Sequence, residues 1–113
     1  LSYETLSHTS TYQEYQEPCG MMSKMLYNVP NNEIKYRLIP MNFQTPFAMR
    51  APGEATGSFA LESAMDEMAW KLKMDPVEFR IKNDTQIDLG ADKPFSSRLL
   101  IEFLRIGPEK FGL

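Results

Sequence analysis

The sequence has 113 residues, of which 42% are apolar and 24% charged, and this composition suits one small domain with a packed core. The formal net charge of −3 offers no basic surface for nucleic acid, and no run of 18 apolar residues could span a membrane. The single cysteine, Cys19, excludes an internal disulfide and is compatible with a reducing compartment, which favours the cytoplasm and leaves the periplasm open.

Residues 1–18 are polar and aromatic without a clear period, which predicts an irregular segment with at most a short strand near 2–7. The chain opens on Leu1, and neither a methionine nor a signal-peptide pattern is present there. We therefore expect a segment cut from a longer protein, or a processed or trimmed chain. Such a start buries little surface and is expected to lie against another part of the protein.

A strand region is predicted over residues 19–44. Apolar spacing over 21–27 fits either a short helix or a buried strand, and these alternatives stay open. The alternation over 34–43 predicts a strand, in which Pro40 requires an edge position or a bulge.

The loop over residues 45–57 is rich in turn-forming residues and leads into the best predicted helix. Those residues are Pro46, Pro52, Gly53 and Gly57. A loop that leads into a helix N-terminus brings free backbone N–H groups and the positive end of the helix dipole together. Arg50 adds a fixed positive charge. These features indicate either an anion-binding loop or a well-capped helix start.

Three helices are predicted after this loop, at about 57–73, 76–83 and 97–106, so residues 58–113 form a helical region. The first has an apolar stripe at helical spacing, formed by Leu61, Ala64, Met65, Met68, Ala69 and Leu72. A strand region followed by helices predicts an α+β fold, and residues 1–113 are expected to form a single segment of a larger domain.

The helix boundaries follow from local signals. Asp75 is expected to be the N-cap of the second helix, with Pro76 at its first position and Glu78 completing a capping box. Residues 84–95 are predicted to be a loop. Ser96 or Ser97 is expected to cap the third helix. Gly107-Pro108 is expected to end or kink it.

Other clusters of reactive residues favour a structural interpretation. His8 and Cys19 lack the supporting residues of a nucleophile or metal site, so no catalytic or metal-ligating residue is assigned. The carboxylates of the first helix lie on its polar face and predict solvated side chains: Glu62, Asp66 and Glu67. Phe59 and Trp70 lie beside the apolar stripe and are expected in the core.

Residues 49–54, Met-Arg-Ala-Pro-Gly-Glu, and 59–67, Phe-Ala-Leu-Glu-Ser-Ala-Met-Asp-Glu, resemble the molybdenum-binding large subunit of the xanthine dehydrogenase and aldehyde oxidase family. The resemblance covers roughly residues 12–113, a small part of that subunit. Supporting stretches are Glu17-Pro18-Cys19, Pro30-Asn31, Met74-Asp75-Pro76, Pro94-Phe95-Ser96-Ser97-Arg98 and Glu109-Lys110-Phe111-Gly112.

The resemblance implies a molybdenum–molybdopterin cofactor in the intact protein and the hydroxylation of aldehydes or N-heterocycles with oxygen from water. The implied partners are the remainder of the large subunit and the iron–sulfur and FAD-containing domains or subunits that carry electrons away. The catalytic glutamate of the family lies in a downstream segment that none of the glutamates here matches, so this chain by itself is expected to be inactive.

The resemblance also implies the site residues. The backbone N–H of Arg50 is expected to hydrogen-bond a cofactor oxygen, and Met49, Ala51, Pro52 and Gly53 are expected to shape the approach. The xanthine-oxidising branch has a second aromatic residue where this chain has Pro52, which favours the aldehyde-oxidising branch. The alternative is a non-catalytic module that binds a partner chain through an exposed apolar surface.

Overall fold

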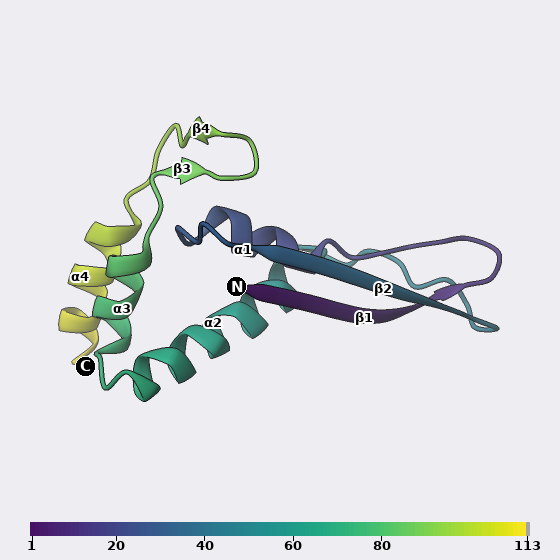
Figure 1. The fold of residues 1–113 in the computed structure, drawn as a ribbon, viewed down its shortest axis with the longest axis horizontal. Helices are drawn as coiled ribbons and strands as arrows, with labels where there is room; N and C mark the ends of the chain where they lie inside the picture. Colours follow the sequence, from purple (N-terminus) through teal and green to yellow (C-terminus); the bar gives the residue numbers. More distant parts are fainter. Residues whose placement is uncertain (113) are drawn as a thin grey trace. The chain divides into compact units, whose positions relative to one another are not determined.

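The computed structural model of the chain describes residues 1–112. Its elements in chain order are β1 (Ser2–Ser10), the 3-10 helix η1 (Cys19–Met21), α1 (Met22–Met25), β2 (Glu33–Met41), α2 (Glu54–Lys71), α3 (Pro76–Asn83), β3 (Ile87–Asp88), β4 (Lys93–Pro94) and α4 (Leu100–Phe111), as labelled in Figure 1. This mixture of strands and helices confirms the predicted α+β class. The chain forms two compact units, the first comprising residues 1–23 and 29–61 and the second 24–28 and the chain from 62 onward.

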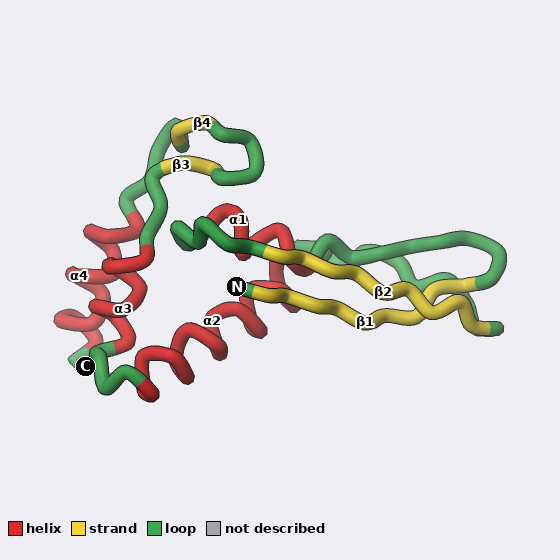
Figure 2. Tube along the Cα trace, viewed as in Figure 1, coloured by secondary structure: helices red, strands yellow, loops and turns green. Residues whose placement is uncertain are grey.

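The first unit is built on two long strands, β1 and β2, that run in parallel along their whole length (Figure 2). Their register pairs Ser2 with Glu33 and Ser10 with Met41. The predicted strand at 34–43 is therefore confirmed, with bounds of 33–41. Pro40 lies within β2, which is an edge strand of this two-stranded sheet, as its missing N–H donor requires.

Residues 2–10 were expected to be mostly irregular, and the nine-residue strand β1 corrects this. The segment lacks the apolar alternation that identifies a strand from sequence. It contains several Thr and Tyr residues, which suit extended backbone, and its backbone groups pair with β2. Pairing with a distant segment thus decides a conformation that the local pattern leaves undetermined.

The segment after β1 is held by buried hydroxyl groups. The Thr9 side chain is 1% exposed, accepts a hydrogen bond from the Tyr15 N–H at 2.8 Å and donates one to the Gln13 carbonyl at 3.2 Å. Ser10 accepts from the Tyr12 N–H at 3.1 Å. Because buried polar groups are costly unless paired, these bonds fix the turn that brings residues 15–19 back along the first unit.

For residues 21–27 the sequence left a short helix and a buried strand as alternatives. The structure has a short helix there, α1.

Helix α2 begins at Glu54 rather than near residue 57, so the loop before it ends at Gly53. Leu61 and Ala69 of the predicted apolar stripe are buried at 2% and 1% exposure. The expectation that Phe59 and Trp70 belong to the core is wrong, since their side chains are 78% and 82% exposed. The stripe itself is only partly buried, because Ala64, Met68 and Leu72 are exposed. Helical periodicity therefore predicted the buried positions Leu61 and Ala69 but overestimated how much of α2 belongs to the core.

Helix α3 matches its predicted bounds of 76–83 and its predicted cap. The Asp75 carboxylate accepts hydrogen bonds from the backbone N–H groups of Val77 at 2.8 Å and Glu78 at 3.0 Å, and Pro76 occupies the first turn. The residues that cap α3 lie within four positions of one another. The start of this helix is therefore determined locally and does not depend on a long-range contact.

Helix α4 differs from the prediction at both ends. Leu99, and not Ser96 or Ser97, precedes its first residue, and no side chain caps it. The helix continues through Gly107-Pro108 to Phe111, and Gly112 follows it as a C-cap in the left-handed conformation at φ 84°. The prediction that Gly107-Pro108 ends the helix is therefore wrong, and Pro108 lies in its last turn. The predicted loop at 84–95 contains a short antiparallel hairpin, β3 with β4.

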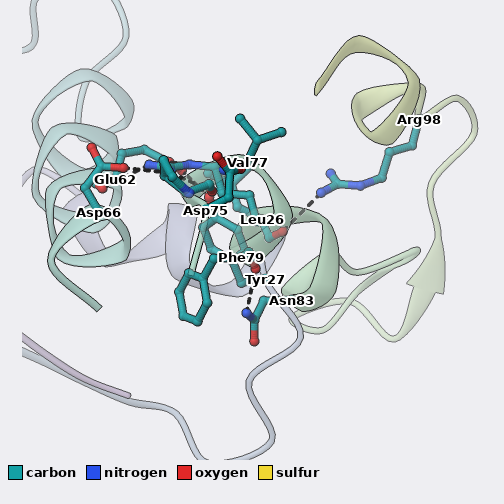
Figure 3. Close-up of polar contacts among 11 residues, drawn as sticks. Leu26, Tyr27, Glu62, Asp66, Asp75, Val77, Phe79, Asn83 and Arg98 are labelled. Carbon is teal, nitrogen blue, oxygen red and sulfur yellow. Dashed lines mark hydrogen bonds and ion pairs between the residues drawn. The ribbon is translucent and has the colours of Figure 1, made fainter. Parts of the chain in front are cut away.

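A network of polar side chains holds the second unit together (Figure 3). The Arg80 guanidinium forms ion pairs at 2.7 Å with both Glu62 and Asp66 of α2 and donates to the Glu62 and Pro76 carbonyls. Asp66 and Glu67 are exposed as expected, whereas Glu62 is half-buried, and the pairing of Glu62 and Asp66 with Arg80 was not predicted. Their helical spacing of four residues places both carboxylates on the face where Arg80 lies.

Tyr27 is 4% exposed and donates a hydrogen bond from its phenol to the Glu62 carboxylate at 2.7 Å. Burial, together with this bond to an anion, raises the pKa of Tyr27 above its ordinary value of 10. Just above pH 10, Tyr27 is therefore still protonated in the native state but deprotonated in the unfolded state. The contribution of Tyr27 to stability is complete below pH 10 and is lost as pH rises above that value.

Replacing Tyr27 with phenylalanine is expected to lower the stability of the second unit by about 1–2 kcal/mol at neutral pH, because a hydrogen bond to a charged group is lost. The same change should flatten the decline in stability above pH 10. Thermal melts of wild type and variant at pH 7 and at higher pH check both effects. If the stability of wild type and of the variant fell equally above pH 10, the role assigned to the Tyr27 phenol would be contradicted.

Candidate cofactor-facing loop

The loop that leads into α2 contains two residues in the left-handed region of backbone conformation. Ala51 has φ 57° and Gly53 has φ 83°. Glycine adopts this region without cost, whereas alanine is strained there by about 1 kcal/mol or more. A non-glycine residue held in this conformation indicates that the surrounding structure imposes the path of the chain, as is common where a loop faces a ligand.

The turn contains hydrogen-bond donors that are not used within the chain. Within residues 1–112, the backbone N–H groups of Arg50, Ala51 and Gly53 donate no hydrogen bond. The loop carbonyls, by contrast, are used: those of Ala51 and Gly53 accept from Ala55 at 3.2 Å and from Gly57 at 2.8 Å. These bonds attach the turn to the first turn of α2, whose dipole places partial positive charge at the same end.

The five residues predicted to form the site lie in one continuous turn with different exposures. Met49 is 81% exposed, Arg50 and Ala51 are exposed, Pro52 is half-buried and Gly53 is buried. The Arg50 guanidinium forms no ion pair with the described carboxylates. The turn therefore presents the positive charge of Arg50 to solvent, whereas Gly53 lies buried at its end.

The anchor is a contact that sequence reasoning missed. A methyl group built on Gly53 would lie 2.7 Å from the Pro18 carbonyl carbon, and one built on Gly57 would lie 1.9 Å from the Cys19 carbonyl oxygen. Real methyl groups do not approach so closely, so only glycine fits at either position. Their spacing of four residues was the available sequence signal, because it places both on one face of the helix start.

Side chains reinforce this contact. The Cys19 sulfur lies 3.1 Å from the Thr56 hydroxyl, which donates to the Glu17 carboxylate at 3.3 Å. On the other side, the Gly20 N–H donates to the Tyr36 hydroxyl of β2 at 3.2 Å. Residues 17–20, which we call the bracing segment, thus contact both β2 and the first turn of α2.

A pocket of about 280 Å³ adjoins the bracing segment. Its lining includes Leu6, His8, Tyr15, Cys19, Phe47 and Thr56. The Tyr15 and Phe47 rings stack with centroids 5.8 Å apart, and His8 contacts Phe43 edge to face. Desolvation raises the pKa of the Tyr15 phenol, and the neighbouring Glu17 carboxylate adds to the rise. His8 and Cys19 share the pocket wall without a hydrogen bond between them among the described contacts.

No group of three or more metal-ligating side chains is found within residues 1–112. No helix in the same range has the length and hydropathy of a membrane span. The donor-rich turn suits a ligand that carries oxygen acceptors.

Residues 1–84 match the molybdopterin cofactor-binding domain, and the chain belongs to this family. Among its relatives is PaoC, the molybdenum-binding subunit of aldehyde oxidoreductase, from Escherichia coli K12 and O157:H7. This chain is 50% identical to both over 97 residues, which cover 85% of this chain and 13% of each relative. An aldehyde oxidoreductase from Megalodesulfovibrio gigas is 42% identical over 57 residues, covering 50% of this chain and 6% of the relative.

A solved structure has the same fold. The aldehyde oxidoreductase of Desulfovibrio gigas superposes with a TM-score of 0.78 at 25% identity, over 96% of this chain and 13% of that one. The chain thus spans about 13% of the length of its PaoC relatives and of this structure. The predicted resemblance to a molybdenum-binding subunit of the aldehyde-oxidising branch is confirmed.

The chemistry of the turn fits the cofactor of this family. Molybdopterin carries oxygen acceptors of the kind that unbonded N–H groups bind, and its pterin ring carries N–H donors. The following residue, Glu54, has a buried carboxylate oxygen, Oε2, that meets no hydrogen-bond donor within residues 1–112. The turn and the start of α2 therefore provide both donors and an acceptor, which suits a mixed ligand better than a simple anion.

Proposed function

We propose that this chain is a single segment of the molybdenum-binding subunit of an enzyme that oxidises aldehydes with oxygen derived from water. The observation that carries the proposal is the turn at Met49–Gly53, whose free N–H donors are held rigidly at the start of α2. The similarity to aldehyde oxidoreductase subunits supports the reaction class.

The residues of the turn have distinct roles in this proposal. The backbone N–H of Arg50 hydrogen-bonds a cofactor oxygen, and the adjacent guanidinium adds positive charge. Ala51 and Gly53 supply the left-handed conformations that aim these groups, and Met49 and Pro52 shape the approach. The bound cofactor supplies the redox chemistry, whereas this chain binds and orients it.

The remaining partners follow from the reaction. Contacts to so large a cofactor come from many segments, so the remainder of the subunit, including the catalytic glutamate, completes the site. Iron–sulfur and FAD groups on partner domains or subunits remove the electrons. Pro52 stands where the xanthine-oxidising branch has an aromatic ring, and this supports an aldehyde rather than a purine as the substrate.

The reaction is tested directly with isotopically labelled water. The complete gene product that contains this sequence is purified from a host that makes the molybdenum cofactor. It is then incubated with an aromatic aldehyde and an artificial electron acceptor in ¹⁸O-labelled water. The proposal predicts a carboxylate product and reduced acceptor at matching rates, with product oxygen labelled beyond the exchange of the aldehyde alone. Absence of turnover in a molybdenum-loaded protein would contradict it.

The site is tested by replacing Gly53 with valine in the same gene product. Valine is disfavoured at φ 83°, and its Cβ would overlap the Pro18 backbone, so the turn must move. We expect a lower molybdenum content per chain. Ala60→Val is the matched control because Ala60 is exposed on the same helix. Equal molybdenum content in Gly53→Val and wild type would exclude a cofactor-facing role.

A further inference from the structure

We infer that Gly57 is a positioning residue for the turn at Met49–Gly53, acting through its contact with the bracing segment. The inference rests on the proposed function, since the turn matters because it faces the cofactor. Gly57 belongs to α2 and is not expected to touch the cofactor itself. Its effect is transmitted through the backbone of Pro18 and Cys19, which lies against the first turn of the helix.

A side chain at position 57 would overlap the bracing segment. Gly57 is buried, and its Cα faces the Cys19 carbonyl so closely that an added methyl group would lie 1.9 Å from the oxygen, 2.8 Å from the carbonyl carbon and 3.1 Å from Cα. All three atoms belong to the backbone, so no side-chain rotation can relieve the overlap. Either the bracing segment or the start of α2 must move.

The bracing segment is held in place by β2. Its other side contacts β2, because a methyl group on Gly20 would lie 2.4 Å from Ile34 Cγ2 and the Gly20 N–H donates to the Tyr36 hydroxyl. The Met21 N–H also donates to the Pro18 carbonyl at 3.0 Å. A segment fixed against the strand yields less readily than the helix start.

The start of α2 is hydrogen-bonded to the turn at Met49–Gly53. The Gly57 N–H donates to the Gly53 carbonyl at 2.8 Å, and Gly53 itself contacts Pro18. Displacement of Gly57 from Cys19 therefore moves Gly53 and, with it, the donors of Arg50 and Ala51. Binding that depends on several donors at fixed positions is sensitive to shifts well below 1 Å.

The sign of the Gly57→Ala effect separates this account from ordinary helix behaviour. In an unobstructed helix the change is stabilising, because alanine has the higher helix propensity. We expect the opposite here. In the complete gene product without cofactor, hydrogen exchange over residues 50–57 is read at the hydrogen-bonded amides of Ala55 and Gly57. Exchange there should rise about tenfold, while exchange at 62–71 stays within about twofold of wild type. Molybdenum content should fall severalfold.

The matched control is Ala60→Ser, which adds one heavy atom to the exposed face of the same helix and should change neither reading. If Gly57→Ala does not accumulate as folded protein, Thr56→Val takes its place. That change removes the hydroxyl that contacts Cys19 and Glu17 without adding volume. Faster exchange at 50–57 and reduced molybdenum content would again support the positioning role.

Wild-type exchange at 50–57 and wild-type molybdenum content in a folded Gly57→Ala protein would overturn the inference, as would the same result in Thr56→Val when the first variant does not fold. A uniform rise in exchange over 50–71 would also overturn it, because a general structural role predicts that pattern. The exchange reading needs no cofactor, so it tests the inference even if wild type proves to bind no molybdenum, a result that would contradict the proposed function instead.

Discussion

Replacing Arg98 with leucine is expected to lower the free energy of opening of the second unit by about 3–5 kcal/mol. Arg98 and Asp84 form an ion pair at 2.5 Å whose side chains are 12% and 3% exposed. Arg98 also donates to the Leu26 carbonyl at 3.1 Å (Figure 3). A further bond reaches the Met25 carbonyl at 3.5 Å. Its loss leaves a buried carboxylate without its counter-charge.

Hydrogen exchange at residues 24–28 and 76–88 in the complete gene product measures this opening directly. The double variant Arg98→Leu with Asp84→Leu should lose less stability than Arg98→Leu alone, because the carboxylate left unpaired is removed with its partner. Arg105→Leu is the matched control, since Arg105 is exposed and makes no ion pair among the described residues. A loss below about 1 kcal/mol for Arg98→Leu would show that the pair is not a determinant of the fold.

Replacing Arg80 with leucine is expected to have the second largest effect. It should lower the free energy of unfolding of the second unit by about 2–4 kcal/mol. Arg80 is 15% exposed and joins α3 to two carboxylates of α2, but Asp66 is 65% exposed and its ion pair is partly screened by solvent. Desolvation lowers the pKa of Arg80, and the bonds to Glu62 and Asp66 outweigh this and raise it. The side chain therefore stays charged, and its stabilisation does not vary with pH near neutrality.

The geometry of Arg80 distinguishes arginine from lysine. The guanidinium reaches Glu62 through Nε and Asp66 through Nη1, and it donates to the Glu62 carbonyl through Nη2. A lysine ammonium is a point charge and cannot reproduce this fork. We expect Arg80→Lys to recover less than half of the stability lost in Arg80→Leu, as measured by urea denaturation followed at α2 and α3. Full recovery by lysine would mean that charge alone, and not the fork, carries the effect.

Elements with short-range signals could be predicted from the sequence. The cap of α3 depends on Asp75 and the three residues after it, and β2 shows alternation within its own length. Strand β1 has no such signal and exists because it pairs with residues 31 positions away. The ends of α4 were mispredicted because the helix starts after Leu99 without a side-chain cap and includes Pro108, a residue that usually ends a helix.

The Gly/Pro-rich turn and its resemblance to a family led to the prediction of a site at Met49–Gly53. In the structure these residues form the turn directly before α2. Their contact with a cofactor stays a prediction. The contact of Gly53 and Gly57 with Pro18 and Cys19 was not predictable, because it joins segments more than 30 residues apart and depends on backbone atoms. Ion pairs such as Arg98 with Asp84 depend on the same kind of tertiary contact.

Metal analysis of the complete gene product, beside the 113-residue chain expressed alone, tests the central claim most directly. Both are produced in a host that makes the molybdenum cofactor. The account predicts molybdenum near one atom per chain in the complete product and none in the 113-residue chain, because the turn at Met49–Gly53 supplies only part of the cofactor site. Absence of molybdenum from both would contradict the account and favour a non-catalytic module that binds a partner through its exposed apolar side chains.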